Sequence, residues 1–343
     1  MMKIFLRLLI LLTYISVINA NSQECIIVQN GEDMTIYYDS CLDDAFNDAL
    51  DGSTIYISGG NFSFCDGATV VDKKLTIFGA GVYPVATTAT NRTKINGNLK
   101  LRPGAEGTIL TGLKFNELQA TVDDITISRC NFTTLVPQAH INNWLIEESI
   151  FDGINSSAFK SSYFIIMKNF INTFHSTNTY SLRYVNSSQI NNNAFLGDPY
   201  IRFDRLYDNI ISNNIFSAHV GYFYYFCSDN FTFNCILTNF NSLSSSNNVD
   251  SNTLINQSAA NHFVSYGSGN NTPFSFSNNY NLKDESAGKE YGTDGYDVGV
   301  YGTDDPFKDN ALPFNPHIQE AVVANKSLNG GIKVKLKIEA QSK

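Results

Sequence analysis

The sequence predicts an all-β fold in which the chain winds into a single-stranded, right-handed parallel β-helix of about ten coils. Three observations predict this fold: an apolar motif recurring about every twenty residues, a strand-forming composition around each copy, and an asparagine at a fixed place in several copies. Because one coil of short strands buries its apolar side chains only by stacking on its neighbours, a repeat of this kind indicates a solenoid.

The recurring motif is a large apolar residue followed five positions later by another. Successive motifs begin 17 to 25 residues apart, which excludes helical repeats because these need about 33–47 residues per unit. The segments are rich in Ile, Phe, Tyr, Thr and Asn, which favour strands and bends over helices. The eight motifs are Leu110–Phe115, Ile127–Phe132, Ile146–Phe151, Ile165–Phe170, Ile190–Phe195, Ile211–Phe216, Phe231–Ile236 and Val249–Leu254.

Asparagines recur three residues after the first apolar member of consecutive motifs. Stacked at a bend, their amides can donate to one neighbour, accept from the other and satisfy backbone groups that the turn leaves unpaired. Earlier coils carry Cys130, Ser149 and Lys168 at this place, so the predicted ladder is partial. A structural role is favoured over ligand binding. The predicted rungs are Asn193, Asn214, Asn234 and Asn252.

The first twenty residues predict a secretory signal peptide. Lys3 and Arg7 open the segment, an apolar run follows, and Ala20 offers a small residue for cleavage. The alternative is a membrane anchor, which needs about 18 or more consecutive apolar residues, and this run is shorter. We therefore expect a secreted or cell-envelope protein without a membrane span after cleavage.

The mature chain is predicted to form one β-helix over residues 21–282 and a C-terminal cap over residues 283–343. Both ends need covering because an open solenoid end exposes apolar residues and unpaired strand edges. Residues 43–52 predict a short amphipathic helix that caps the first coil. Beyond Asn281 the chain becomes rich in Gly and Asp, and residues 330–340 alternate as a strand.

A family resemblance supports the same fold. The entry of many pectate-lyase-like right-handed β-helix proteins resembles ALDGSTIYISGGNFSF, residues 49–64. Uncharacterised exported β-helix proteins of Bacteroidetes type are similar to this chain in NRTKINGNLKLRPGAEGTILTGLKF, residues 91–115, and DGYDVGVYGTDDPFKDNALPFNPHIQ, residues 294–319. The resemblance implies export and a right-handed parallel coil. It leaves the activity open, because such folds include polysaccharide lyases, hydrolases, tailspikes and adhesins.

Charge and cysteine content exclude some function classes. A formal net charge of −9 argues against nucleic-acid binding, which needs a basic face. The six cysteines follow the signal peptide, and Cys25–Cys41 and Cys227–Cys235 are the predicted local disulfides. No CxxC motif occurs, so a zinc site is not expected.

No cofactor is expected. Calcium is the alternative, because the C-terminal segment contains several aspartates, although they lack the regular spacing of an EF-hand loop. These residues are Asp294, Asp297, Asp304, Asp305 and Asp309.

Two catalytic chemistries are compatible with a β-helix of this kind, glycoside hydrolysis and polysaccharide lysis. A glycoside hydrolase needs carboxylates that converge, and the candidates Glu147 and Asp250 lie five coils apart. A lyase needs a cation that neutralises a uronate carboxylate and a base that removes the neighbouring proton. The segment 198–208 offers arginines beside an aspartate, and a loop of salt bridges is the structural alternative. The weak catalytic candidates are Arg183, Arg202, Arg205 and Asp204.

Aromatic residues crowd the same region and could stack against sugar rings; the alternative is that they fill the coil. The candidates for substrate binding are Tyr200, Tyr222 and Tyr224. We expect a surface or secreted protein that contacts polysaccharide without a clear catalytic constellation. The alternatives are a polysaccharide lyase acting on uronate-containing glycan and a structural or adhesive solenoid of the cell envelope.

Overall fold

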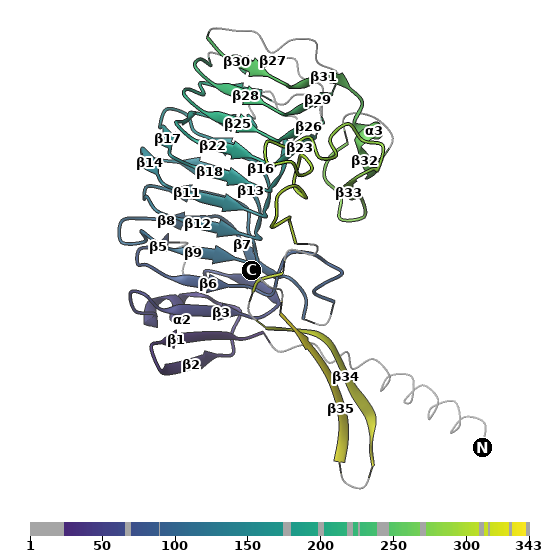
Figure 1. Ribbon diagram of the computed structural model, residues 1–343. Helices are drawn as coiled ribbons and strands as arrows, with labels where there is room; N and C mark the ends of the chain where they lie inside the picture. The colour runs from purple at the N-terminus through teal and green to yellow at the C-terminus, as the bar shows by residue number, and fades with distance from the viewer. Residues whose placement is uncertain are drawn as a thin grey trace, which may run out of the picture.

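The computed structural model (Figure 1) describes residues 24–65, 70–88, 90–173, 180–197, 202–217, 222–225, 227–238, 247–267, 272–308, 312–314, 316–328 and 331–340. These residues form a parallel β-solenoid, which confirms the predicted all-β fold class. The handedness of the coil stays a prediction. The predicted signal peptide lies outside the described residues, and within them no helix is long and apolar enough to cross a membrane.

The first sheet has 12 strands stacked along the coil axis. Strand β1 pairs antiparallel with both β2 and β3. From the pair of β3 with β6 onwards, all neighbouring strands are parallel. In spatial order the strands are β2 (Asp33–Tyr37), β1 (Ile26–Asn30), β3 (Thr54–Ile57), β6 (Thr76–Phe78), β9 (Ile109–Thr111), β12 (Thr126–Ser128), β15 (Leu145–Glu147), β18 (Ile165–Met167), β22 (Gln189–Asn191), β25 (Ile210–Ser212), β28 (Phe231–Phe233) and β30 (Val249–Ser251).

The second sheet contains the next strand of each coil. Its main path is β31 (Leu254–Gln257), β29 (Ile236–Thr238), β26 (Ile215–Phe216), β23 (Ala194–Gly197), β19 (Phe170–Thr173), β16 (Ile150–Asn155), β13 (Asn131–Pro137), β10 (Leu113–Lys114), β7 (Thr93–Asn96) and β4 (Gly60–Ser63). Strands off this path are β5 (Val70–Val71), β8 (Leu99–Leu101), β11 (Glu117–Ala120), β20 (Leu182–Arg183), β24 (Arg202–Asp204) and β27 (Tyr222–Tyr225).

A third, short sheet closes three consecutive coils on the remaining side. It consists of β14 (Ile141–Asn142), β17 (Ser161–Ser162) and β21 (Val185–Asn186), all parallel. Isolated bridges from Asn186 to Tyr207 and from Tyr207 to Ser228 extend the same side over two further coils.

Apolar side chains stack inside the coil from one turn to the next. The rings of Phe115, Phe132 and Phe151 lie nearly parallel, with successive centroids 5.3 and 4.9 Å apart. Trp144 and Phe164 stack in the same way at 5.7 Å. Since strand neighbours are about 4.8 Å apart, a ring at one position meets its equivalent in the next coil, which explains the apolar repeat.

The register differs from the predicted motifs by one residue in three coils. Ile127 and Ile146 occupy the inward position in β12 and β15, whereas the equivalent residue in β18 is Ile166 and not Ile165. Likewise Thr232 and Asp250 occupy this position, not Phe231 and Val249. The misassigned residues Ile165, Phe231 and Val249 face outward and are 40%, 53% and 49% exposed.

An amide ladder follows the first sheet inside the coil. The backbone N–H and Nδ2 of Asn169 donate to Oδ1 of Asn193, and those of Asn193 donate to Oδ1 of Asn214. Ser149 and Cys235 occupy the same place in flanking coils, and the Ser149 N–H donates to Asn169. The ladder therefore includes Asn169, which the sequence analysis did not identify.

The other two predicted rungs, Asn234 and Asn252, lie one residue earlier, at the bend itself. Their φ angles are 49° and 53°, in the left-handed region that asparagine tolerates better than most residues. The one-residue register shift in these coils explains the displacement.

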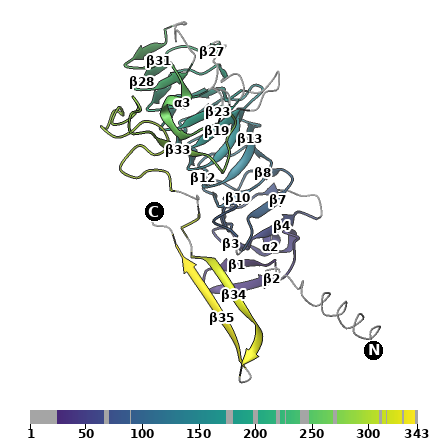
Figure 2. The ribbon, with the colours of Figure 1, turned by 90° about the vertical axis from the view of Figure 1, so that its right-hand side faces the viewer.

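The C-terminal segment lies along the side of the coil (Figures 1 and 2). We call its described residues 259–267, 272–308 and 312–314 the C-terminal strap; it includes α3 (Ala259–His262), β32 (Phe263–Ser265) and β33 (Asn279–Leu282). Phe170, Ile215 and Ile236 on the outer face of the second sheet pack with strap residues into a second apolar cluster. The strap thus buries a face of the coil, and it begins at residue 259, inside the span 21–282 that the sequence predicts as β-helix.

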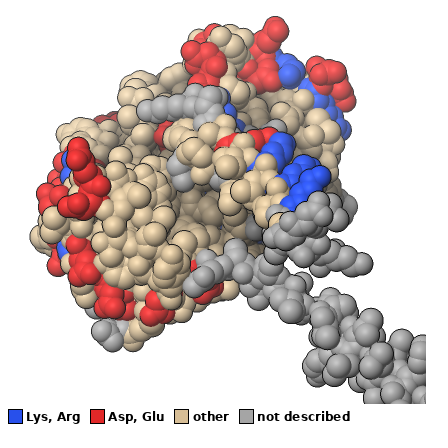
Figure 3. Space-filling model, turned by 90° about the horizontal axis from the view of Figure 1, so that it is seen from below, with Lys and Arg blue, Asp and Glu red and all other residues tan. Residues whose placement is uncertain are grey.

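A hairpin of β34 (His317–Leu328) and β35 (Gly331–Glu339) follows the strap and projects away from the coil (Figure 2). At the N-terminal end, α2 (Asp43–Asp48) precedes the first parallel strand and buries Phe46 against Phe64. Figure 3 shows this end, with acidic side chains gathered along its left edge. Exposed acids around β2, such as Glu32 and Asp33, oppose pairing of the edge strand with another chain.

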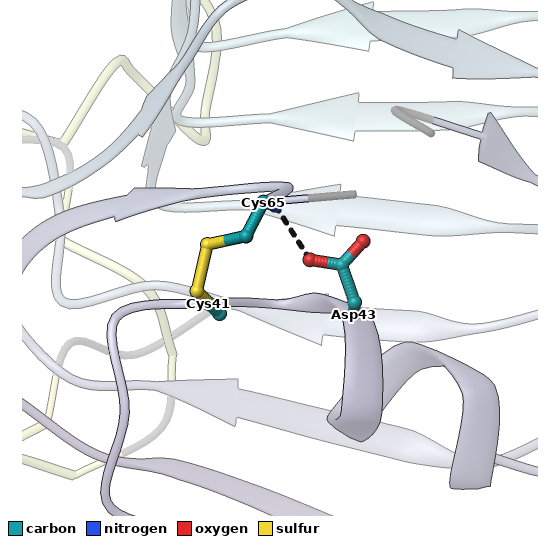
Figure 4. A group of neighbouring side chains, drawn as sticks. All are labelled: Cys41, Asp43 and Cys65. Carbon is teal, nitrogen blue, oxygen red and sulfur yellow. Dashed lines mark hydrogen bonds between the residues drawn. A yellow bond between two sulfur atoms is a disulfide. The ribbon is translucent and has the colours of Figure 1, made fainter. Parts of the chain in front are cut away.

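One disulfide links Cys41 to Cys65, across the turn that contains α2 (Figure 4). The predicted pairs Cys25–Cys41 and Cys227–Cys235 do not form, and Cys25, Cys130, Cys227 and Cys235 are not part of a disulfide. Cys227 lies on the side of the third sheet and Cys235 in the amide ladder, so proximity in sequence does not bring their sulfurs together.

Candidate functional site

Residues in the left-handed conformation mark the bend between the third sheet and the first. We call this bend the open corner; it consists of Asn143, Tyr163, Ser187, Asp208 and Asp229, whose φ angles lie between 48° and 62°. Tyr163 carries a phenol ring, and Asp208 and Asp229 carry carboxylates. Tyr163, Ser187, Asp208 and Asp229 are exposed, so successive coils present polar groups to solvent at the same position.

A second amide ladder supports the open corner from inside. The backbone N–H and Nδ2 of Asn209 donate to Oδ1 of Asn230, and those of Asn230 donate to Oδ1 of Asn248. The Ser188 N–H donates to Asn209. This ladder was not predicted from the sequence. Its asparagines recur 21 and 18 residues apart, so an alignment of the coils would identify them.

A hollow of about 430 Å³ lies on the outside of the open corner. It spans four consecutive coils and contains a lysine, two carboxylates, a phenol, an amide and two hydroxyls. Its lining residues are Lys160, Ser162, Asn186, Ser187, Tyr207, Asp208 and Asp229. Such a mixture of donors and acceptors around an aromatic ring suits a hydroxyl-rich ligand.

An arginine cluster lies beside this hollow, on the preceding residues of the same coils. The Arg183 Nε and Arg205 Nη1 atoms lie 2.8 and 2.7 Å from Oδ2 of Asp204, whose side chain is fully buried. The Arg183 guanidinium lies 4.6 Å from the Tyr180 ring centroid, and both guanidiniums lie over Tyr184, at 5.5 and 5.3 Å. Two predicted arginines and the predicted aspartate thus come together as an ion-paired cluster.

This arrangement favours binding over proton abstraction. An arginine acts as a base only when its guanidinium is neutral, and a carboxylate within 3 Å stabilises the charged form. Arg183 and Arg205 both lie at that distance from Asp204. Their guanidinium groups can still contact a ligand, because Arg183 and Arg205 are partly exposed.

The other predicted site residues are only partly described. Tyr200 and the side chains of Arg202, Tyr222 and Tyr224 lie outside the described residues. Along the backbone, Arg202 pairs in register with Tyr222, and Phe203 pairs with Tyr224. This places the described parts of the two predicted segments, residues 202–208 and 222–225, on adjacent coils.

Other reactive groups are buried. Burial raises the pKa of the Cys130 and Cys235 thiols to about 12, so neither is a thiolate at neutral pH. His262 Nδ1 lies 2.9 Å from Ser286 Oγ, and burial lowers the pKa of His262. Because His262 is 1% and Ser286 6% exposed, a polymeric substrate cannot reach this pair.

Metal-binding groups are equally few among the described residues, where Cys41, Asp43 and Cys65 form the one cluster with suitable spacing. Figure 4 shows that its two sulfurs are joined as a disulfide, while Asp43 accepts a hydrogen bond from the Cys65 N–H at 2.6 Å. In the strap, Asp297 pairs with Lys289 and Asp305 with Lys168 and Lys308. The expectation of no cofactor, with calcium as the alternative, stays a prediction.

The chain matches no protein-family model, no curated protein and no solved structure. Its function is therefore argued from the solenoid and from the residues gathered at the open corner.

Proposed function

We propose that this protein is a secreted or cell-surface β-solenoid that binds polysaccharide along the open corner and does not cleave it. The observation that carries the proposal is the juxtaposition of the hollow with the arginine and tyrosine cluster on the same coils. The predicted signal peptide supports export. So does the Cys41–Cys65 disulfide, because disulfides persist mainly in oxidising compartments.

The balance of charges indicates the class of polysaccharide. Three cations, Lys160, Arg183 and Arg205, lie among three carboxylates, Asp204, Asp208 and Asp229, so the formal charges sum to zero. A densely anionic polymer would meet Asp208 and Asp229 as like charges. A chain rich in hydroxyl groups, with few or no uronates, fits better because the carboxylates accept its hydroxyl protons and the tyrosines stack on its rings.

The test is affinity electrophoresis in gels containing glucan, mannan, galactan, pectin, alginate or a glycosaminoglycan. We expect retardation by at least one of the less charged polymers, and its loss in Tyr207→Ala and Asp208→Ala. Tyr296→Ala is the matched control, because it removes an exposed tyrosine of the strap far from the hollow in sequence. Equal retardation of all variants would show that the open corner is not the binding surface.

The same polymers separate binding from cleavage. A lyase releases unsaturated products that absorb in the ultraviolet, so continuous recording with pectin, alginate and glycosaminoglycan should stay flat with and without calcium. A rising absorbance that Arg183→Lys abolishes would overturn the proposal in favour of the lyase alternative.

A further inference from the structure

We infer that the aromatic pocket between residues 83–85 and the C-terminal strap binds one neutral pyranose ring, such as a terminal sugar or a side branch of a glycan. This pocket lies on a different side of the chain's coil from the open corner, since the strap covers the second sheet. The inference therefore stands independently of the proposed function.

The pocket joins two segments that are almost 200 residues apart in sequence. Its volume is about 300 Å³, at the lower end of the range for small-molecule sites, which suits a single ring rather than a long chain. Its aromatic walls are Tyr83, Phe274, Phe276, Tyr280 and Tyr301.

The walls are held in place before any ligand arrives. The Tyr83 and Phe276 rings meet edge to face at 4.9 Å, and Phe274 stacks on Tyr280 at 5.5 Å. The Phe274 N–H donates to Oδ1 of Asn172 on β19, which ties this wall to the coil. A pre-ordered aromatic wall reduces the entropy lost on binding.

Polar groups in the lining are amides and hydroxyls, and no lining residue carries a charge. Asn281 Nδ2 donates to Asn279 Oδ1 at 2.8 Å, and Asn278 Nδ2 donates to the Tyr266 carbonyl and to the Tyr280 hydroxyl. The Asn279 and Asn281 side chains are exposed at the pocket. Amides beside aromatic faces match a pyranose, which has an apolar C–H face and a rim of hydroxyls.

The absence of charge in the lining decides between sugar classes. A uronate carboxylate placed in this pocket would lose water without gaining a cation, which is costly. A neutral hexose or deoxyhexose loses only hydroxyl hydration, and the amides can replace it. The pocket therefore differs from the open corner in position and in the size of its ligand, because it suits a single neutral ring rather than a length of polymer.

The probes are the methyl glycosides of glucose, galactose, mannose, fucose and galacturonic acid, tested on the full chain by saturation-transfer NMR and titration. We expect at least one neutral glycoside to bind and the galacturonate to bind at least tenfold more weakly. Tyr83→Ala should weaken neutral binding by about tenfold, and Asn279→Ala by about threefold to tenfold. Asn279 is exposed, so its variant should fold even if Tyr83→Ala does not.

Tyr296→Ala is the matched control, because Tyr296 is an exposed tyrosine of the strap that does not line the pocket, and it should leave glycoside binding unchanged. The inference is overturned if no neutral glycoside binds, if galacturonate binds equally well, or if Asn279→Ala and Tyr83→Ala both leave the affinity and the saturation-transfer pattern unaltered. Failure of the proposed function looks different, because polymer retardation would then be absent or insensitive to Tyr207→Ala while glycoside binding persists.

Discussion

Two corners of the coil share the same left-handed backbone conformation but differ in what surrounds them. The open corner lies between the third sheet and the first. The bend between the first and second sheets, which we call the covered corner, contains left-handed residues with φ between 47° and 57°. Each corner has an amide ladder directly inside it. The residues of the covered corner are Arg129, Glu148, Lys168, Asn192, Asn213, Asn234 and Asn252.

The strap completes the hydrogen bonding of the covered corner. Asn213 donates to the Thr293 hydroxyl and accepts from the Thr293 N–H, and Lys168 donates to the Asp305 carbonyl. Approach is very close at Gly112, where an added Cβ would lie 2.2 Å from Pro313 Cγ. Identical bends thus serve two purposes: one holds the strap, and the other leaves its side chains available for a ligand.

The largest predicted effect tests whether the covered corner is structural. Arg129 is fully buried, pairs with Glu148 at 2.5 Å and donates to the Leu312 carbonyl. Arg129→Ala should lower the free energy of unfolding by about 3–5 kcal/mol, because it leaves the Glu148 carboxylate buried with a poorer partner. Urea denaturation measures this change. Asp208→Ala at the open corner should cost less than about 0.5 kcal/mol, and equal losses would contradict the distinction between the corners.

The two ladders allow a matched comparison, because each lies inside the coil regardless of what covers its corner. Asn214→Leu leaves the backbone N–H of Asn193 without its acceptor, and Asn209→Leu does the same to the backbone N–H of Ser188. We expect each to cost about 2–4 kcal/mol, since buried donors without partners cost about 1–3 kcal/mol each. A much smaller loss for Asn209→Leu in urea denaturation would mean that the open corner tolerates water inside the bend.

One carboxyl group of the second sheet creates a pH dependence of stability. Burial raises the pKa of Asp152, on β16, to about 6. Because the folded state holds this proton more tightly than the unfolded chain, the proton stabilises the fold. This stabilisation is fully present below about pH 4 and is lost as the pH rises through 6. Asp152→Asn should therefore be more stable than wild type by up to about 3 kcal/mol at pH 8 and equal to it at pH 4. Melting curves at both pH values check this, and a constant difference between the proteins would contradict the assignment.

Sequence periodicity was sufficient to predict the coil and part of the first ladder. It could not decide which of two neighbouring apolar residues points inward, as Ile165 and Ile166 illustrate, because both satisfy a spacing of about twenty. The open corner depends on that register: Ser187, Asp208 and Asp229 align only when Asn209 and Asn230 are recognised as rungs. Contacts of the strap, such as Asn213 with Thr293 and Arg129 with Leu312, join unrepeated residues, so no period reveals them.

The smallest predicted effect compares the backbone strain of the two corners. Tyr163 at the open corner has φ 59° and is 62% exposed, whereas Lys168 at the covered corner has φ 54° and pairs with Asp305 at 3.3 Å. Glycine relieves about 1–2 kcal/mol of left-handed strain but loses part of this through the more flexible unfolded chain. Tyr163→Gly should therefore stabilise by about 0.5 kcal/mol, while Lys168→Gly should destabilise because the ion pairs are lost. Tyr163→Ala keeps the Cβ and should give no gain in the urea midpoint. A loss of stability in Tyr163→Gly would show that the tyrosine side chain, and not the bend alone, holds the open corner in shape.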